Sequence, residues 1–141
     1  MLNKLILRDE ILKKDNNYRT DIQLVFSTYQ NRPVKYLTDK LEETVHRTNL
    51  KLCRYFLKRQ ETRIHFLGFI EGLNSKNLHC HTILKIPPMY SDDDVINKLT
   101  YHYRQIEPFG KVYRGSYRPD LYFNNLSYCM KKYHEDTFIY L

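Results

Sequence analysis

Two apolar segments joined by a short polar turn constrain the fold of this chain more than any other feature. They cover residues 64–71 and 78–86, and both are rich in aliphatic, aromatic and β-branched side chains. The turn between them contains Asn74-Ser75-Lys76-Asn77, whose residue types favour tight turns. Strands joined by so short a connection pair in antiparallel fashion. We therefore predict a β-hairpin whose second strand is central in a sheet.

Two helical patterns and two further strands surround this hairpin. Residues 22–29 and 111–117 are rich in strand-forming side chains and are expected to form the first and last strands. Apolar residues recur at steps of three and four within residues 37–56 and again within 96–106, which predicts two amphipathic helices. A capping box that begins at Ser91 opens the second helix.

This order of elements, β-α-β-β-α-β, predicts a ferredoxin-like α+β fold with a central antiparallel sheet and helices on one face. The opposite face of the sheet would then be free to bind a ligand. A last helix is expected to begin at Asn124 or Asn125 and to reach about Glu135. The 141 residues contain no linker, so we expect one domain, residues 1–141, in which residues 1–20 form an N-terminal arm.

Charge and composition narrow the classes of function. Lys and Arg number 23 against 16 Asp and Glu, and the net charge of +7 favours a polyanionic partner. No run of about 18 uncharged apolar residues is present, so no membrane span is expected. The three cysteines are scattered and odd in number, which suits neither a disulfide framework nor a zinc knuckle. These features predict a cytoplasmic protein.

The second hairpin strand carries a pair of histidines. His79 and His81 are two residues apart, so their side chains project from the same face of a strand. Glu71, on the partner strand, would join them if the turn has an odd number of residues, such as 75–77 or 73–77. With an even number it would point away.

Two imidazoles and one carboxylate form a ligand set that suits a divalent ion with open positions for substrate oxygens. With a phosphate substrate, Mg²⁺ or Mn²⁺ is expected. The ordinary alternative is that His79 and His81 are surface histidines and that Glu71 is a solvated edge residue.

The last predicted helix combines an apolar stripe with a basic side. The stripe has the spacing i, i+3, i+4, i+7 and consists of Leu126, Cys129, Met130 and Tyr133. Tyr128 lies on the other side, near Lys131 and Lys132 at i+3 and i+4. Positive charge favours the phenolate of a nearby tyrosine, which makes Tyr128 a candidate nucleophile.

Aromatic and basic residues also alternate before this helix. The chain has 13 tyrosines and no tryptophan. Such pairs suit stacking on unpaired bases while the cations contact phosphates. The candidates for DNA binding are Tyr103, Arg104, Tyr113, Arg114, Tyr117 and Arg118.

Together these motifs resemble the HUH single-strand endonucleases, and among them the rolling-circle replication initiators (Rep proteins) of plasmids and phages. Phe26-Ser27-Thr28 is similar to the first motif of that family, Leu78-His79-Cys80-His81 to its His-hydrophobic-His strand, and Tyr128-Cys129-Met130-Lys131 to its Y-x-x-K helix. The resemblance covers residues 22–135, with the motifs in the family's order.

The resemblance implies a metal-dependent endonuclease and ligase that acts on single-stranded DNA. Mn²⁺ or Mg²⁺ held by His79, His81 and Glu71 would polarise the scissile phosphate, and Tyr128 would attack it. The expected products are a 5′-phosphotyrosine link and a free 3′-hydroxyl that primes a polymerase.

Further roles follow from the same resemblance. Lys131 would orient the phosphate, with Lys132 as its alternative, and Tyr133 is an alternative or second nucleophile. The expected substrate is hairpin or single-stranded origin DNA, with a helicase and a polymerase supplied by a bacterial or archaeal host. The protein would be encoded by a plasmid or a virus and act in the host cytoplasm.

Three other interpretations remain. A single-tyrosine HUH transposase of the insertion-sequence type shares the fold and the chemistry. A non-catalytic ferredoxin-like module would bind single-stranded nucleic acid by stacking and would need outward-facing aromatics on its central strands. A basic protein bound to a membrane surface would need an amphipathic helix with a bulky apolar face, which the sequence lacks.

Overall fold

A computed structural model describes residues 19–72, 78–114 and 138–141 of the chain. Within these residues it contains a five-stranded sheet, two α-helices and one 3-10 turn. The elements in chain order are β1 (Arg19–Ser27), α2 (Val34–Leu52), η1 (Gln60–Thr62), β2 (His65–Glu71), β3 (His79–Ile86), α3 (Asp92–Ile106), β4 (Lys111–Arg114) and β5 (Phe138–Tyr140).

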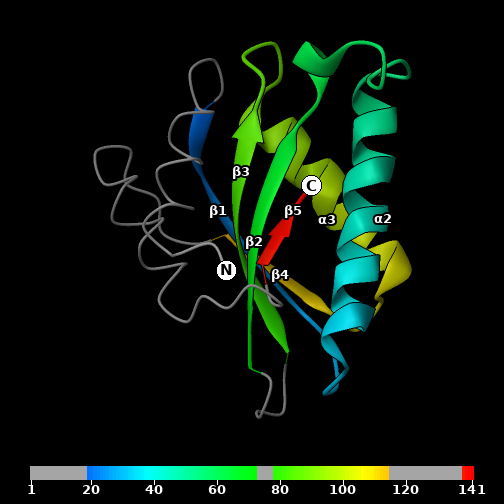
Figure 1. Ribbon diagram of the computed structural model, residues 1–141, viewed down its shortest axis with the longest axis vertical. Helices are drawn as coiled ribbons and strands as arrows, with labels where there is room; N and C mark the ends of the chain where they lie inside the picture. The colour runs from blue at the N-terminus through cyan, green and yellow to red at the C-terminus, as the bar shows by residue number, and fades with distance from the viewer. Residues whose placement is uncertain (1–18, 73–77, 115–137) are drawn as a thin grey trace.

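The sheet has the strand order β4-β1-β3-β2-β5, and each strand is antiparallel to its neighbours. Both helices pack on the same face of the sheet (Figure 1). The first four strands therefore have the order of a ferredoxin-like fold, with β1 and β3 in the centre. The predicted α+β class, antiparallel sheet and placement of the helices are confirmed.

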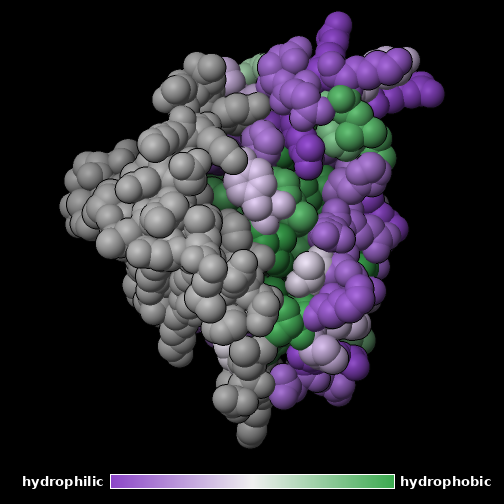
Figure 2. All heavy atoms as spheres, viewed as in Figure 1, coloured by the Kyte–Doolittle hydropathy of each residue, from purple (hydrophilic) through white to green (hydrophobic). Residues whose placement is uncertain are grey.

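The core lies between the sheet and the two helices. Successive side chains on a strand alternate between faces, so every second residue of β1, β2 and β3 points to the helices. The sheet supplies Leu24, Phe26, Phe66, Ile70, Cys80, Leu84 and Ile86, and the helices supply Leu37, Leu41, Val45, Val95, Leu99 and Tyr103. Hydrophilic side chains cover the outer face of α2 (Figure 2), as expected for an amphipathic surface helix.

The helix ends follow the sequence signals in one case and depart from them in the other. Ser91 caps α3, because its hydroxyl accepts a hydrogen bond of 3.2 Å from the backbone N–H of Asp94. α2 ends at Leu52, although the apolar pattern continues to Phe56. Phe56 lies in the turn that follows and is still buried. The pattern therefore reported burial beyond the helix itself.

Strand β5 is an element that the sequence did not indicate. It pairs with the free edge of β2, with Leu67 opposite Tyr140 and Gly68 opposite Ile139. Two backbone hydrogen bonds of 2.9 Å between Phe66 and Leu141 extend this pairing. The strand has three residues, too few to show an alternating pattern.

The face of the sheet opposite the helices is not free over its whole area, which corrects the expectation of an uncovered face. Leu67, Phe69, Ile83 and Lys85 project from this face, and each is at most 3% exposed. On the same face, Tyr140 of β5, which lies opposite Leu67, is 41% exposed, and Lys111 and Tyr113 of β4 are exposed as well. Neither α2 nor α3, the helices of the described part, is long and apolar enough to cross a membrane.

Candidate metal centre and the adjoining pocket

The register of the β2–β3 hairpin decides which side chains share a face. Glu71 lies directly opposite His79, and Phe69 lies opposite His81. Because paired residues point to the same face, Glu71, His79 and His81 all project from the side away from the helices. Cys80 points into the core and is fully buried. The connection therefore has the odd length that brings Glu71 to the histidines.

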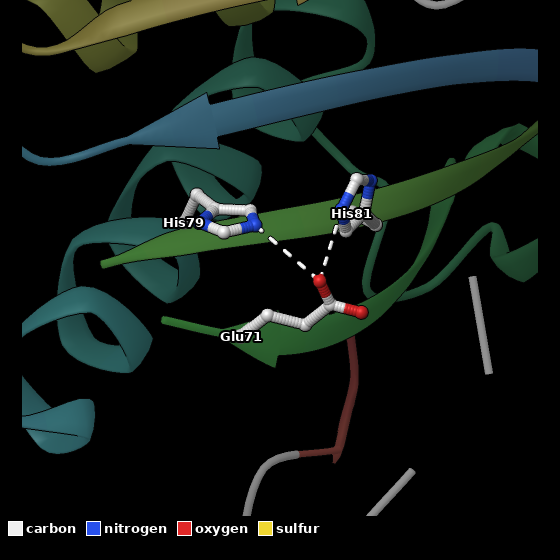
Figure 3. A group of neighbouring side chains, drawn as sticks. All are labelled: Glu71, His79 and His81. Carbon is white, nitrogen blue, oxygen red and sulfur yellow. Dashed lines mark ion pairs between the residues drawn. The ribbon is translucent and has the colours of Figure 1, made fainter. Parts of the chain in front are cut away.

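The three side chains converge on one point (Figure 3). The Nε2 atoms of His79 and His81 each lie 3.4 Å from the same oxygen, Oε2 of Glu71. One ligand atom from each residue can be chosen so that all three lie within 4.8 Å of one another. Among the described residues, this is the group of side chains that could hold a metal ion.

These distances fit a shared ion. Two atoms bound to one metal at about 2.1 Å, with an angle of about 90–110° between them, are about 3.0–3.4 Å apart. The observed 3.4 Å separations lie at the upper end of that range and are longer than an ordinary N–H···O hydrogen bond of about 2.7–3.2 Å. Two neutral nitrogen donors and one carboxylate also form a common set for divalent metals. The residues therefore fit the group that the sequence predicts.

Burial differs across the cluster. The side chain of Glu71 is 5% exposed, that of His81 is 12% and that of His79 is 31%. Electrostatic interactions are stronger at the buried carboxylate than they would be in water. The cluster is therefore closed at Glu71 and open at His79, so a ligand would approach from the His79 side.

A row of paired residues connects the open side of the cluster to β4. Ser27 at the end of β1 lies opposite His79 of β3 on one side and opposite Lys111 of β4 on the other. All three project from the face of the metal cluster. A pocket of about 420 Å³ lies at this end of the sheet, and its lining includes Ser27, Tyr29, His79, Phe109, Lys111 and Tyr113.

The turn between α3 and β4 is fixed by three hydrogen bonds. Tyr103 donates its phenolic hydrogen to the backbone carbonyl of Ser27 at 2.8 Å. Tyr36 donates to the carboxylate of Glu107 at 2.6 Å, and the N–H of Gly110 donates to the carbonyl of Glu107 at 3.0 Å. The hydrogen bond to Glu107 raises the pKa of Tyr36. This network holds the start of β4, and therefore the wall of the pocket, against the end of β1.

The structure divides the predicted DNA-binding residues. The prediction that Tyr103 binds DNA is wrong, because its ring is fully buried in the core and cannot stack on a base. Its burial raises its pKa well above the usual range. Tyr113 is 51% exposed and lines the pocket. Arg104 is exposed near the end of α3, and Arg114 lies 3.7 Å from Asp93, outside the lining of this pocket.

Six other predicted site residues lie outside the described residues. They are Tyr117, Arg118, Tyr128, Lys131, Lys132 and Tyr133. The predicted final helix and the part of the last strand beyond Arg114 lie there as well.

Three aromatic or basic residues of the pocket were not singled out as site residues from the sequence. Tyr29 follows β1, and Phe109 and Lys111 flank Gly110 before and at the start of β4. The pairing of Ser27 with both neighbouring strands brings them to the histidines. The only signal in the sequence was the presence of aromatic and basic residues near the end of β1 and the start of β4. The register that pairs these two strands is not visible in the local sequence.

Comparisons with known proteins add little to this description. No protein-family model and no curated protein sequence matches the chain. Among solved structures, the chain is similar to the crystal structure of a hydrolase from Listeria innocua, with 10% sequence identity and a TM-score of 0.34. The match covers 88% of this chain and 81% of that chain. A likeness of this extent indicates neither fold nor function.

Proposed function

We propose that this protein is a metal-dependent endonuclease and strand transferase of the HUH type, which nicks single-stranded DNA to initiate rolling-circle replication. The convergence of His79 and His81 on Glu71 carries the proposal, because it turns a sequence motif into a ligand set with metal-binding distances. The ferredoxin-like sheet, the motif order and the net charge of +7 support it.

The ligand set suits a phosphate substrate. Mn²⁺ or Mg²⁺, held by Glu71, His79 and His81, would polarise the oxygens of the scissile phosphate and offset the charge that develops on them. The buried carboxylate of Glu71 supplies the one negative charge of the set. The partly exposed ring of His79 marks the side from which the phosphate enters.

The nucleophile in this proposal is the phenolic oxygen of Tyr128. It loses its proton to solvent and forms a bond to phosphorus, while the bond from phosphorus to the 3′ oxygen breaks and that oxygen takes up a proton. The result is a 5′-phosphotyrosine and a free 3′-hydroxyl, and the reverse reaction religates the strand. Lys131 orients the phosphate during the attack. Tyr133 is the alternative nucleophile.

A covalent-adduct gel tests this proposal. The protein is mixed with labelled single-stranded or hairpin DNA and Mn²⁺, with and without chelator, and then denatured. We expect a labelled protein band that needs metal, disappears in Tyr128→Phe and persists in Tyr133→Phe. Tyr101→Phe, an exposed tyrosine on α3, is the matched control.

The other outcomes are equally informative. Loss of the band only in Tyr133→Phe would keep the activity and move the nucleophile. If no adduct forms on any substrate, the proposed activity is wrong. A non-catalytic stacking module has less support, because Leu67 and Phe69, the apolar residues on the outer face of β2, are at most 3% exposed.

A further inference from the structure

The pocket beside His79 combines three exposed aromatic rings. Tyr29 is 58% exposed, Phe109 is 71% and Tyr113 is 51%, and the first two lie with ring centroids 5.3 Å apart. All three line the same cavity. A contiguous patch of exposed apolar surface marks an interaction site more often than scattered single exposed residues do.

The charge of the pocket is positive. Lys111 is an exposed lining residue at the first position of β4. None of the described residues that line the pocket is acidic. Aromatic rings beside an ammonium group suit a ligand that has both a flat ring system and a negative charge, and a nucleotide has both. The volume of about 420 Å³ lies within the usual range of about 300–1,000 Å³ for small-ligand sites.

The pocket is also continuous with the open side of the metal cluster. His79 belongs to both, as a predicted ligand of the metal and as a wall of the pocket. Lys111 is two strands away on the same face, paired through Ser27. Neighbouring strands are about 4.8 Å apart, so the backbones at Lys111 and His79 are about 10 Å apart. A nucleotide joined to the phosphate at the metal would reach this pocket.

We propose that this pocket binds the nucleotide next to the scissile phosphate, with its base stacked on Tyr29, Phe109 and Tyr113 and a flanking phosphate at Lys111. The proposal rests on the proposed function, because it assigns the pocket to the same single-stranded DNA. It makes these residues determinants of where the strand is cut. The metal cluster on one side of His79 would then carry the chemistry, and the pocket on its other side would position the DNA strand.

Binding without cleavage tests the pocket separately from the chemistry. Fluorescence anisotropy is measured in chelator with a labelled single-stranded oligonucleotide of mixed sequence. Tyr113→Ala and Phe109→Ala should each weaken binding by about 5- to 150-fold, the usual loss when one base loses its stacking partner. Tyr113→Phe should retain the affinity of the wild type, because the ring remains.

Lys111→Ala has a different signature. It should weaken binding and lower the slope of affinity against salt concentration by about one phosphate contact. The matched controls are Tyr55→Ala and Lys58→Ala, which remove exposed side chains from the turn after α2, away from the pocket. They should leave the contribution of the pocket's aromatic rings to the affinity for the oligonucleotide unchanged. Circular dichroism of each variant shows that it folds.

A scan of abasic positions locates the nucleotide. In an oligonucleotide that forms the adduct, removing the base at one position beside the cleaved bond should weaken binding by the wild type and have no further effect in Tyr113→Ala. If the pocket variants bind like the controls while the adduct still forms, the pocket assignment is wrong and the activity stands. If the wild type neither binds DNA nor forms an adduct, both are wrong.

Discussion

Glu71 and His79 lie directly opposite each other in neighbouring strands, and Oε2 of the first is 3.4 Å from Nε2 of the second. The contact is set by backbone register, since a shift of one residue would move Glu71 to the helix-covered face. His81 reaches the same oxygen from two residues further along β3. Strand pairing therefore positions the ligand set, with Glu71 as the last residue of β2 and His79 as the first residue of β3.

Glu71→Gln should weaken binding of Mn²⁺ in the absence of DNA. The change keeps the size of the side chain and removes the only negative charge of the cluster. Loss of a residue that merely supports a ligand costs about 10- to 100-fold in metal affinity, so loss of a ligand should cost at least about tenfold. Isothermal titration calorimetry measures the dissociation constant. Glu61→Gln, at an exposed position of η1, is the control, and equal affinities in the two variants would contradict the site.

The sequence predicted which three residues form this cluster, but it did not predict that all three share one face of the sheet. The spacing of His79 and His81 alone places both imidazoles on one face, because the period of a strand is two residues. The face on which Glu71 lies depended on whether the turn has an odd or an even number of residues. The residue types of a turn do not show where strand pairing begins, so the sequence left this number open. The pocket at Tyr29, Phe109 and Lys111 is set by pairing between distant strands, which no local pattern records.

Tyr103→Phe should destabilise the fold and not act on DNA directly. The variant removes the hydrogen bond of 2.8 Å to the carbonyl of Ser27. Loss of one partly buried hydrogen bond costs about 1–2 kcal/mol of unfolding free energy. Urea denaturation measures the loss, and Tyr101→Phe, exposed on the same helix, should cost much less. Equal stability of the two variants would show that Tyr103 does not anchor β1.

Tyr103 also shows how two patterns compete for one residue. Its neighbour Arg104 and its ring chemistry favoured nucleic-acid binding, while its place four residues after Leu99 favoured the core. The structure resolves the conflict for the core, since both side chains are fully buried. Apolar periodicity along a helix is the stronger signal, because burying a ring contributes more free energy than an isolated surface contact.

Gly68→Ala should destabilise the sheet by about 1–3 kcal/mol, the usual cost of overpacking a core. A Cβ at this position would lie 2.8 Å from Sγ of Cys80 and 3.2 Å from Cε1 of Phe66. The double variant Gly68→Ala/Cys80→Ala removes the sulfur from the new methyl group. It should therefore lose less unfolding free energy than the two single variants lose together. Chemical denaturation of all four proteins gives the coupling energy, expected to exceed about 0.5 kcal/mol. Strict additivity would contradict the predicted contact.

His102 should make the protein less stable in mild acid. Burial, together with the nearby charges of Arg47, Lys51 and Lys98, lowers the pKa of His102 below its ordinary 6.5. In the unfolded chain the side chain recovers its ordinary pKa and therefore binds more protons than in the folded protein at the same pH. Stability should consequently fall as the pH drops through about 6.5 and stop changing, for this group, below the lowered pKa of the folded state.

The test compares the pH dependence of stability in two histidine variants. His102→Gln removes the titrating group, so its free energy of unfolding should vary less with pH than that of the wild type. His46→Gln, which makes the same substitution at an exposed histidine of α2, is the matched control. The slope, and not the overall stability, is the quantity compared, because His102→Gln also removes the contact of 3.0 Å between the ring and Thr48 Oγ1. An unchanged slope in His102→Gln would show that burial of this ring does not destabilise its charged form.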